Sequence, residues 1–290
     1  MLGQDLCPRL VRAGFEVIGM DVAAPEPFRL DITQPEEVRR FFETFIPDLA
    51  INCAAYTAVD KAESEVEQAF AVNHQGAAQL AEACRRLGSF LVHLSTDYVF
   101  DGEAKQPYGE EAPAHPINVY GLSKWQGEEA IRARLPRHLI VRTAWLFGVH
   151  GHNFVKTILR LAREREELRV VNDQFGCPTW TGDLADALVT LTRHIQAERT
   201  AINWDTYHFC GGGQTTWHGF AQAIVEEGRR WEPLRAACVL PISTYPTPAR
   251  RPHSSVLDCR KIKAFFNITP QPWRQGLVAM LTKLYGERKH

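Results

Sequence analysis

The chain has 290 residues and a formal net charge of −1, with 45% hydrophobic and 23% charged residues. This length suits one large α/β domain with a smaller partner, and the composition is ordinary for a globular protein. The balanced charge predicts no nucleic-acid partner, and the absence of an apolar run of about 18 residues predicts no membrane span. These features are compatible with an enzyme that acts on small molecules.

Seven cysteines are scattered along the chain, at Cys7, Cys53, Cys84, Cys177, Cys210, Cys238 and Cys259. Their odd number and the lack of a C-x-x-C pair argue against a disulfide framework and against a structural zinc site. We therefore expect a reducing, cytoplasmic setting, in which each cysteine fills space in the core.

Short apolar runs alternate with amphipathic segments in the first half of the chain. We predict strands at residues 15–21, 48–54, 90–95 and 138–146, and helices at 4–12, 33–45, within 61–87 and at 118–135. Thr33, with Glu36 three residues later, predicts an N-cap. Strands that are apolar on both faces and separated by helices predict a doubly wound, Rossmann-like parallel sheet.

The pattern changes near residue 178. Helices at 183–195 and 217–230 mix with short strands such as 207–210, and proline is frequent in 245–252. We predict a dinucleotide-binding domain at 1–177 and a smaller, mainly substrate-binding lobe at 178–290 that can return elements to the main domain. Ligands of open α/β sheets bind at the carboxyl ends of the strands, so the lobe should cover that edge.

Such a fold should open with a strand and a glycine-rich turn, whereas this chain begins Met1-Leu2-Gly3 and continues as a helix. We expect Gly3 to be the last glycine of that turn and the native start to lie one strand and one turn upstream. Asp21 closes the next strand at about the spacing, roughly 20 residues, at which an acidic residue meets the adenosine ribose. Asp31 is a further candidate on the cofactor side, and ordinary turn roles remain the alternative.

The strongest chemical signal is Tyr120-Gly-Leu-Ser-Lys124. Residues four apart share a helix face, and a neighbouring ammonium would lower the pKa of the phenol from about 10 toward the working pH. Such a tyrosine can give a proton to a carbonyl oxygen while hydride reaches the carbon. Thr96 follows the strand at 90–95 and could hydrogen-bond the same oxygen, while Lys124 could hold the nicotinamide ribose.

These residues resemble the extended short-chain dehydrogenase/reductase family, and within it the dTDP-4-dehydrorhamnose reductases. The resemblance spans nearly the whole chain. It rests on the strings NCAAYTAVDKAE (52–63), LSTDYVFDG (94–102), NVYGLSK (118–124), VRTAWLFG (141–148), NDQFGCP (172–178) and TPARRPHS (247–254).

The resemblance implies that hydride passes from NADPH or NADH to C4 of dTDP-4-dehydro-L-rhamnose, a nucleotide-sugar substrate. It assigns catalytic, cofactor-side and substrate-side positions. The catalytic set is Thr96, Tyr120 and Lys124, the cofactor side includes Ala54 and Ala55, and the substrate side includes Val59, Asp97, Tyr98 and Trp145. Further candidates for the substrate lobe are Asn153 and Gln174.

A diphosphate-binding arginine pair and a magnesium-bridged homodimer stay open at this point. Arg250 and Arg251 could clamp a diphosphate, although an ion pair between lobes explains them more simply. Some family members bridge a homodimer through Mg²⁺. Asp5 could match one ligand of that ion, but no second ligand is identified, so no metal site is predicted.

Related activities are the alternatives. A 4,6-dehydratase needs an acid–base pair where this chain has Asp97-Tyr98, and a phenol is a poor base at neutral pH. A 4-epimerase keeps its cofactor bound, and the sequence distinguishes it from a reductase less clearly. A non-catalytic regulatory subunit would have no need for Thr96, Tyr120 and Lys124.

Overall fold

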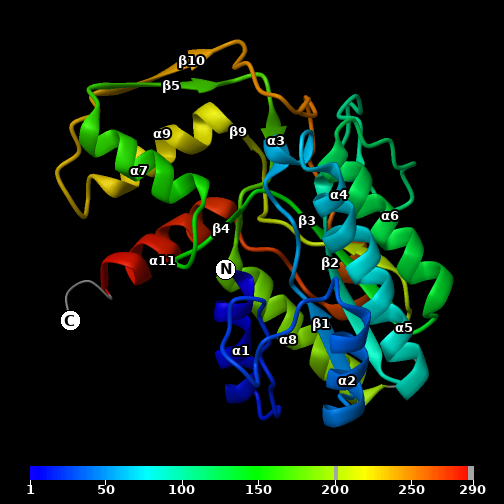
Figure 1. Cartoon of the computed structure of the whole chain (residues 1–290). Coiled ribbons are helices and arrows are strands. Elements are labelled where there is room, and N and C mark those ends of the chain that lie inside the picture. Colours follow the sequence, from blue (N-terminus) through cyan, green and yellow to red (C-terminus); the bar gives the residue numbers. More distant parts are fainter. Residues whose placement is uncertain (199–201, 287–290) are drawn as a thin grey trace.

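The computed structural model describes residues 1–198 and 202–286, which form two lobes (Figure 1). The main lobe is built on a four-stranded sheet in the order β1-β2-β3-β8. These strands are β1 (Leu49–Asn52), β2 (Phe90–Thr96), β3 (His138–Thr143) and β8 (Thr206–His208). All three ladders between them are parallel, which confirms the predicted parallel α/β fold.

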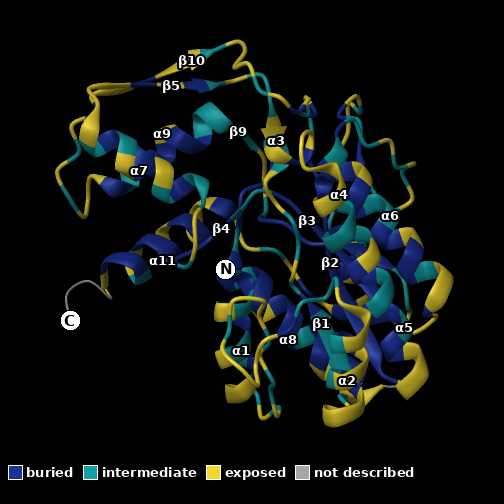
Figure 2. Ribbon diagram, viewed as in Figure 1, coloured by how far each residue is buried: buried dark blue, intermediate teal, exposed yellow. Residues whose placement is uncertain are grey.

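Helices cover both faces of this sheet. One layer contains α2 (Pro35–Phe45), α5 (Ala77–Leu87) and α6 (Val119–Arg134), and the other contains α1 (Leu2–Arg12), α8 (Thr181–Ala197) and α10 (Arg260–Phe266). Along β2, Leu91 packs into the first layer while Phe90 and Val92 pack into the second. Because successive strand residues point to opposite faces, a strand covered on both sides is apolar throughout, and Figure 2 shows β2 and β3 as buried.

The connection from β1 to α5 contains α3 (Val59–Ala62), α4 (Val66–Phe70) and a π-helical turn, η1 (Ala71–Gly76). After β2 the chain makes one 3-10 turn, η2 (Asp97–Val99), before it reaches α6. These segments lie at the carboxyl edge of the sheet, where the predicted site residues are concentrated.

The smaller lobe has its own hydrophobic core. It contains α7 (Phe154–Glu164), β5 (Glu167–Val171), α9 (Trp217–Gly228), β10 (Cys238–Ile242) and α11 (Trp273–Gly286). Two short pairs join the lobes, β4 (Leu146–Phe147) with β7 (Thr179–Trp180), and β6 (Phe175–Gly176) with β9 (Thr215–Thr216). The lobe begins before residue 177, and β8, α8 and α10 return to the main lobe, so each lobe uses several stretches of chain.

Two local predictions are wrong. Residues 15–20 form no strand, although Phe15 and Val17 pack against the core, and the one pairing nearby is an isolated bridge between Asp21 and Arg29. A strand needs a neighbouring backbone to bond, and this segment finds none among the described residues. The N-cap of α2 is Gln34 rather than Thr33, because the hydroxyl of Thr33 donates to Asp31 instead (2.8 Å).

Close packing of α6 depends on two glycines. A Cβ at Gly121 would lie 2.1 Å from the backbone oxygen of Tyr98, and one at Gly127 would lie 2.1 Å from that of Asn73. The helix is capped by Asn118, whose side-chain oxygen accepts from the backbone N–H of Gly121 at 2.7 Å. The helix that carries the predicted catalytic pair is therefore held tightly against η1 and η2.

A buried ion pair fixes the same helix to the sheet. Glu128 of α6 and Arg142 of β3, 0% and 2% exposed, approach to 2.7 Å, and Ser95 of β2 donates to the carboxylate at 2.5 Å. Burial alone would raise the pKa of Glu128, but Arg142 outweighs it and holds that pKa at about 2. Within the described residues, no helix combines the length and apolar character needed to span a membrane.

We predict that Arg142→Met lowers the free energy of unfolding by about 3 kcal/mol, because it removes the buried arginine of Glu128 and leaves that carboxylate only Ser95 and the half-buried Arg132. The matched control is Arg39→Met on α2, whose pairs with Glu36 and Glu43 are exposed, and it should leave the free energy of unfolding close to that of wild type. Urea unfolding measures both. Equal, small losses in the two variants would show that the buried pair does not anchor α6.

Candidate active site

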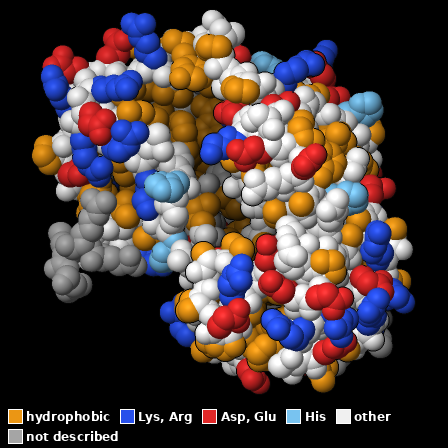
Figure 3. Space-filling view, viewed as in Figure 1, with side chains coloured by type: hydrophobic (Ala, Val, Ile, Leu, Met, Phe, Trp, Pro, Cys, Tyr) orange, Lys and Arg blue, Asp and Glu red, His pale blue; other side chains and the backbone are white. Residues whose placement is uncertain are grey.

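The predicted catalytic residues gather at the carboxyl edge of the sheet. Register places Asn52 of β1 opposite His93, and Thr96 of β2 opposite Thr143 of β3. The residues that directly follow β1, β2 and β3 therefore lie beside one another at this edge of the sheet. Figure 3 shows the surface hollowed between the two lobes, with hydrophobic side chains along its walls.

Tyr120 is buried in this region on the first turn of α6. Its ring packs edge-on against that of Tyr98, with 5.6 Å between centroids, and Val59 packs into the same cluster. The hydroxyl group of Thr96 lies near that of Tyr120 and acts to lower the pKa of the phenol. The structure thus brings together a catalytic pair and two substrate-side candidates that sequence predicted separately.

The acidity of Tyr120 differs from the sequence prediction. Burial raises the pKa of the phenol above its ordinary value of 10, the hydroxyl group of Thr96 offsets part of that rise, and Asp97 and Tyr98 add to it. The predicted lowering by Lys124 is wrong for this arrangement, because the lysine nitrogen is bound elsewhere. At neutral pH the phenol keeps its proton, which suits a proton donor.

Lys124 is 1% exposed and points toward β2. Its Nζ donates to the backbone oxygen of Leu94 at 2.7 Å and lies 3.1 Å from Nε2 of His93. Burial lowers the pKa of Lys124 from 10.5 to about 8, although Glu128 and Cys53 act in the opposite direction. The amine is therefore close to its titration point under physiological conditions.

His93 joins the lysine to the end of β1. Its Nδ1 lies 3.0 Å from Nδ2 of Asn52, whose side-chain oxygen accepts from the backbone N–H of Ala54 at 3.0 Å. This amide orientation makes Nδ1 an acceptor and puts the ring proton on Nε2, facing Lys124. Burial and Lys124 lower the pKa of His93, so the ring is neutral. A neutral ring with its proton on Nε2 favours the uncharged amine of Lys124.

Asn73 organises the loop after β1. It lies in η1, where it exchanges hydrogen bonds with the backbone of Tyr56 (2.9 and 3.0 Å) and donates to Ser123 of α6 at 3.0 Å. Sequence analysis missed both Asn73 and His93. The available signals were weak: a polar side chain inside a helix and a histidine inside an apolar strand.

Asp97 is buried directly after β2. Thr96 donates to its Oδ1 at 3.1 Å, while Oδ2 is buried without a hydrogen-bond partner. Burial raises the pKa of this carboxyl to about 7, and its hydrogen bonds lower it by less. Asp97 is thus a polar group inside the crevice that can exchange a proton near neutral pH.

The other residues predicted on the substrate side contact parts of the protein outside the Tyr120 cluster. Trp145 stacks on Trp217 with 3.6 Å between ring centroids. It packs against the hydrophobic core of the smaller lobe and not against the Tyr120 cluster. Asn153 caps α7 by accepting from the N–H of Lys156 at 3.2 Å. Gln174 is half-buried between β5 and β6.

The arginine pair lies over the start of α6. Arg251 forms a 2.8 Å ion pair with Asp60 and approaches the hydroxyl group of Tyr98 at 3.5 Å. Arg250 has an exposed side chain, and its backbone oxygen accepts from Asn118 at 2.8 Å. Arg251 thus makes an ion pair with a residue far from it in sequence. Of the two roles considered in the sequence analysis, this is the ion pair and not the diphosphate clamp.

The predicted cofactor-side residues lie on several segments of the main lobe. Gly3 is in the first turn of α1, where an added Cβ would meet nothing within 4 Å, so close packing is not its reason here. The carboxylate of Asp21 is exposed and accepts from the N–H of Ala23, and that of Asp31 accepts from Thr33. Past β1, Ala54 is exposed and Ala55 half-buried.

The crevice has the polar groups that a nicotinamide nucleotide and a sugar would need. Oδ2 of Asp97, Oγ1 of Thr143 and Nε of Arg251 are buried without hydrogen-bond partners at or near the ends of β2 and β3. Buried polar groups are normally paired, so these atoms fit contact with a bound polar molecule. Tyr120 and Lys124 stand beside them on α6.

A metal ion receives no support from the described residues. Asp5 is buried, and it accepts from Thr181 at 2.7 Å and from Lys283 at 3.1 Å while Arg9 also contacts it. These partners already satisfy its charge. Across residues 1–198 and 202–286, no group of three His, Cys, Asp or Glu side chains could hold a metal ion.

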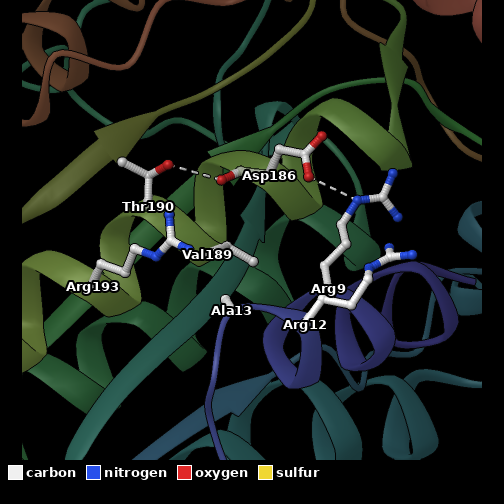
Figure 4. Close-up of a pocket in the computed structure, with 7 residues that line it drawn as sticks. All are labelled: Arg9, Arg12, Ala13, Asp186, Val189, Thr190 and Arg193. Atoms are coloured by element: carbon white, nitrogen blue, oxygen red, sulfur yellow. Dashed lines mark hydrogen bonds and ion pairs between the residues drawn. The ribbon is translucent and has the colours of Figure 1, made fainter.

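A second depression lies between α1 and α8, away from the predicted site residues. It has a volume of about 500 Å³ and is lined by Arg9, Arg12, Ala13, Asp186, Val189, Thr190 and Arg193. Figure 4 shows the guanidinium groups of Arg9 and Arg12 on one side and that of Arg193 on the other, so they do not converge on one point.

A parallel sheet with a tyrosine, threonine and lysine at its carboxyl edge defines a nicotinamide-dependent reductase of the short-chain type. The model of the RmlD substrate binding domain matches residues 1–285. A dTDP-4-dehydrorhamnose reductase of Aggregatibacter actinomycetemcomitans is 42% identical over 280 residues, covering 95% of this chain and 93% of that protein. The chain belongs to the dTDP-4-dehydrorhamnose reductase family and is an NAD(P)H-dependent oxidoreductase.

Solved structures agree. A dTDP-4-dehydrorhamnose reductase from Clostridium acetobutylicum has a TM-score of 0.88 and 38% identity, and the match covers 98% of this chain and 95% of that one. The Bacillus anthracis reductase, solved in complex with NADP, has a TM-score of 0.87 and 35% identity, with coverage of 97% and 95%. The predicted homodimer stays a prediction.

We predict that Lys124 gives the protein a stability that rises with pH. The unfolded chain holds the lysine proton up to about pH 10.5 and the folded one only to about 8, so folding releases a proton between these values. The difference in unfolding free energy between wild type and Lys124→Met should therefore increase from pH 8 to 10 by roughly 1–3 kcal/mol.

Denaturant unfolding across that range measures the difference. The matched control is Lys105→Met, which removes an exposed lysine and measures the effect of losing a surface ammonium group. A pH dependence for Lys124→Met no larger than that of the control would contradict the assigned burial and hydrogen bonding of the amine.

Proposed function

We propose that this chain reduces the C4 keto group of dTDP-4-dehydro-L-rhamnose to give dTDP-L-rhamnose, with Tyr120 as the proton donor. The observation that carries the proposal is the position of the buried Tyr120 beside Thr96 at the end of β2, in a chain of this reductase family. The names of its relatives supply the substrate class, and the structure supplies the groups that could act on it.

Thr96 and Tyr120 are the two hydroxyl groups placed to bind one carbonyl oxygen. When bound, the reduced nicotinamide supplies the hydride, either from NADPH or from NADH. Because burial raises the pKa of Tyr120, its phenol is protonated at neutral pH and can pass that proton to the oxygen as negative charge develops there. Thr96 donates a second hydrogen bond to the same oxygen and orients it.

Lys124 serves the cofactor side of the site. It stands one helical turn beyond Tyr120, and its amine could exchange the backbone oxygen of Leu94 for a ribose hydroxyl. Ala54 and Ala55 would let the cofactor lie close to the end of β1. Val59 and Tyr98, already in contact with the Tyr120 cluster, would face the deoxysugar.

Dehydration is disfavoured by the residue after Asp97. An elimination needs a base at that point, and burial raises the pKa of Tyr98 to about 12, so its phenol keeps its proton at neutral pH. Epimerisation is the alternative that the residues exclude less well, because it uses the same tyrosine and lysine.

The direct test offers dTDP-4-dehydro-L-rhamnose with NADPH and, separately, with NADH. The proposal expects one oxidised cofactor for each dTDP-L-rhamnose formed, counted by absorbance and by chromatography of the sugar nucleotide. An epimerase would change the sugar without net cofactor consumption, and that outcome would reject reduction.

We predict that Tyr120→Phe lowers kcat by about 10²–10⁴-fold with little change in KM, because it removes the proton donor and retains the ring. The matched control is Tyr245→Phe, which deletes a hydroxyl group from an exposed tyrosine and should leave kcat unchanged. Steady-state NADPH oxidation measures both variants. Retention of wild-type kcat in Tyr120→Phe would remove Tyr120 from the chemistry.

A further inference from the structure

Three cysteines that are far apart in sequence meet beneath the junction of the lobes. Cys210 follows β8, Cys259 is the N-cap residue of α10, and Cys177 lies between β6 and β7. The sulfur atoms of Cys210 and Cys259 are 3.6 Å apart, and Cys177 forms a hydrogen bond with Cys210. Their meeting was not predicted, since the sequence suggested only separate core positions.

A cavity of about 740 Å³ opens beside these thiols, and all three line it. Cys177 and Cys210 are buried, whereas Cys259 is half-buried and so is the member that a small molecule reaches first. The thiolate is the reactive form of cysteine, and reactive cysteines are partly exposed.

The proton arrangement within the trio is asymmetric. The hydrogen bond with Cys210 lowers the pKa of Cys177, while hydrogen bonds with Cys177 and Cys259 raise that of Cys210. Cys210 is therefore the thiol that keeps its proton. This gives two distinguishable positions for the reaction: an accessible thiol, Cys259, and a buried thiol in contact with it, Cys210.

We propose that Cys259 and Cys210 form an oxidation site at which a hydroperoxide converts two thiols into one disulfide. The Cys259 thiolate attacks the outer peroxide oxygen, the O–O bond breaks, and a sulfenic acid and an alcohol or water result. The sulfur of Cys210 attacks the sulfenic sulfur, the S–O bond breaks, and the proton of Cys210 leaves with the hydroxyl group as water. Overall, two thiols and one hydroperoxide give one disulfide, one alcohol or water, and one water.

The product would link the end of β8 to the start of α10. Both segments belong to the main lobe, and the sulfur atoms are already in contact, so the bond needs only local adjustment. The site uses none of the residues assigned to the reductase chemistry, so its test stands apart from the proposed function.

The experiment treats the full chain with hydrogen peroxide and compares wild type with Cys210→Ser, Cys259→Ser, Cys177→Ser and the control Cys238→Ser. Wild type should lose two of its seven thiols, counted after denaturation, and regain them with dithiothreitol. Mass spectrometry of a non-reduced digest should show the Cys210–Cys259 link. Cys238 is exposed and lies outside the trio, so its variant should form the same link.

Loss of the reversible step in Cys210→Ser and in Cys259→Ser, with the link retained in Cys177→Ser, supports the proposal. Formation of no link in wild type, or of one between other cysteines, overturns it. Mapping of the wild-type link decides the question even if a serine variant fails to fold. Irreversible oxidation confined to Cys238 would show that exposure alone selects the reactive thiol.

Discussion

Burial of the Lys124 amine is the constraint around which this site is arranged. An amino group in a side chain that is 1% exposed must find hydrogen-bond partners inside the protein: it donates to the backbone oxygen of Leu94 and faces the Nε2–H group of His93. Asn52 fixes that ring from β1, so one chain of hydrogen bonds links β1, β2 and α6. The position of Tyr120 one turn earlier on the helix follows from this link, from the two glycines of α6 and from the ion pair of Glu128.

The same burial explains how the tyrosine can act. A phenol buried against Tyr98 and Val59 is harder to ionise than one in water, so it keeps its proton at neutral pH. That state is the one required for reduction of a carbonyl group, in which the oxygen gains a proton as the carbon gains hydride. Lys124 is then free to serve the cofactor, and its own lowered pKa reflects burial rather than work on the phenol.

Sequence could predict the parts of this arrangement that are local. The apolar strands, the helix that carries Tyr120 and Lys124, and the position of Thr96 at a strand end all follow from short-range patterns. Segment 15–20 has the same apolar pattern but finds no ladder, since strand formation depends on a neighbour. Sequence alone could not predict the roles of His93, Asn73 and the Glu128–Arg142 pair, because each role depends on contact with a residue of another element. The stacking of Trp145 on Trp217 was out of reach for the same reason, because Trp217 lies on a distant helix, and the contact of Trp145 with the sugar stays a prediction.

Transfer of a labelled hydride tests the central claim most directly. The enzyme would be given dTDP-4-dehydro-L-rhamnose and NADPH carrying deuterium at nicotinamide C4, with each C4 face labelled in turn, and the product examined by NMR and mass spectrometry. The account predicts that one labelled face delivers one deuterium to C4 of dTDP-L-rhamnose for every cofactor oxidised. A product without deuterium from either face, or one formed while the cofactor stays reduced, would contradict it.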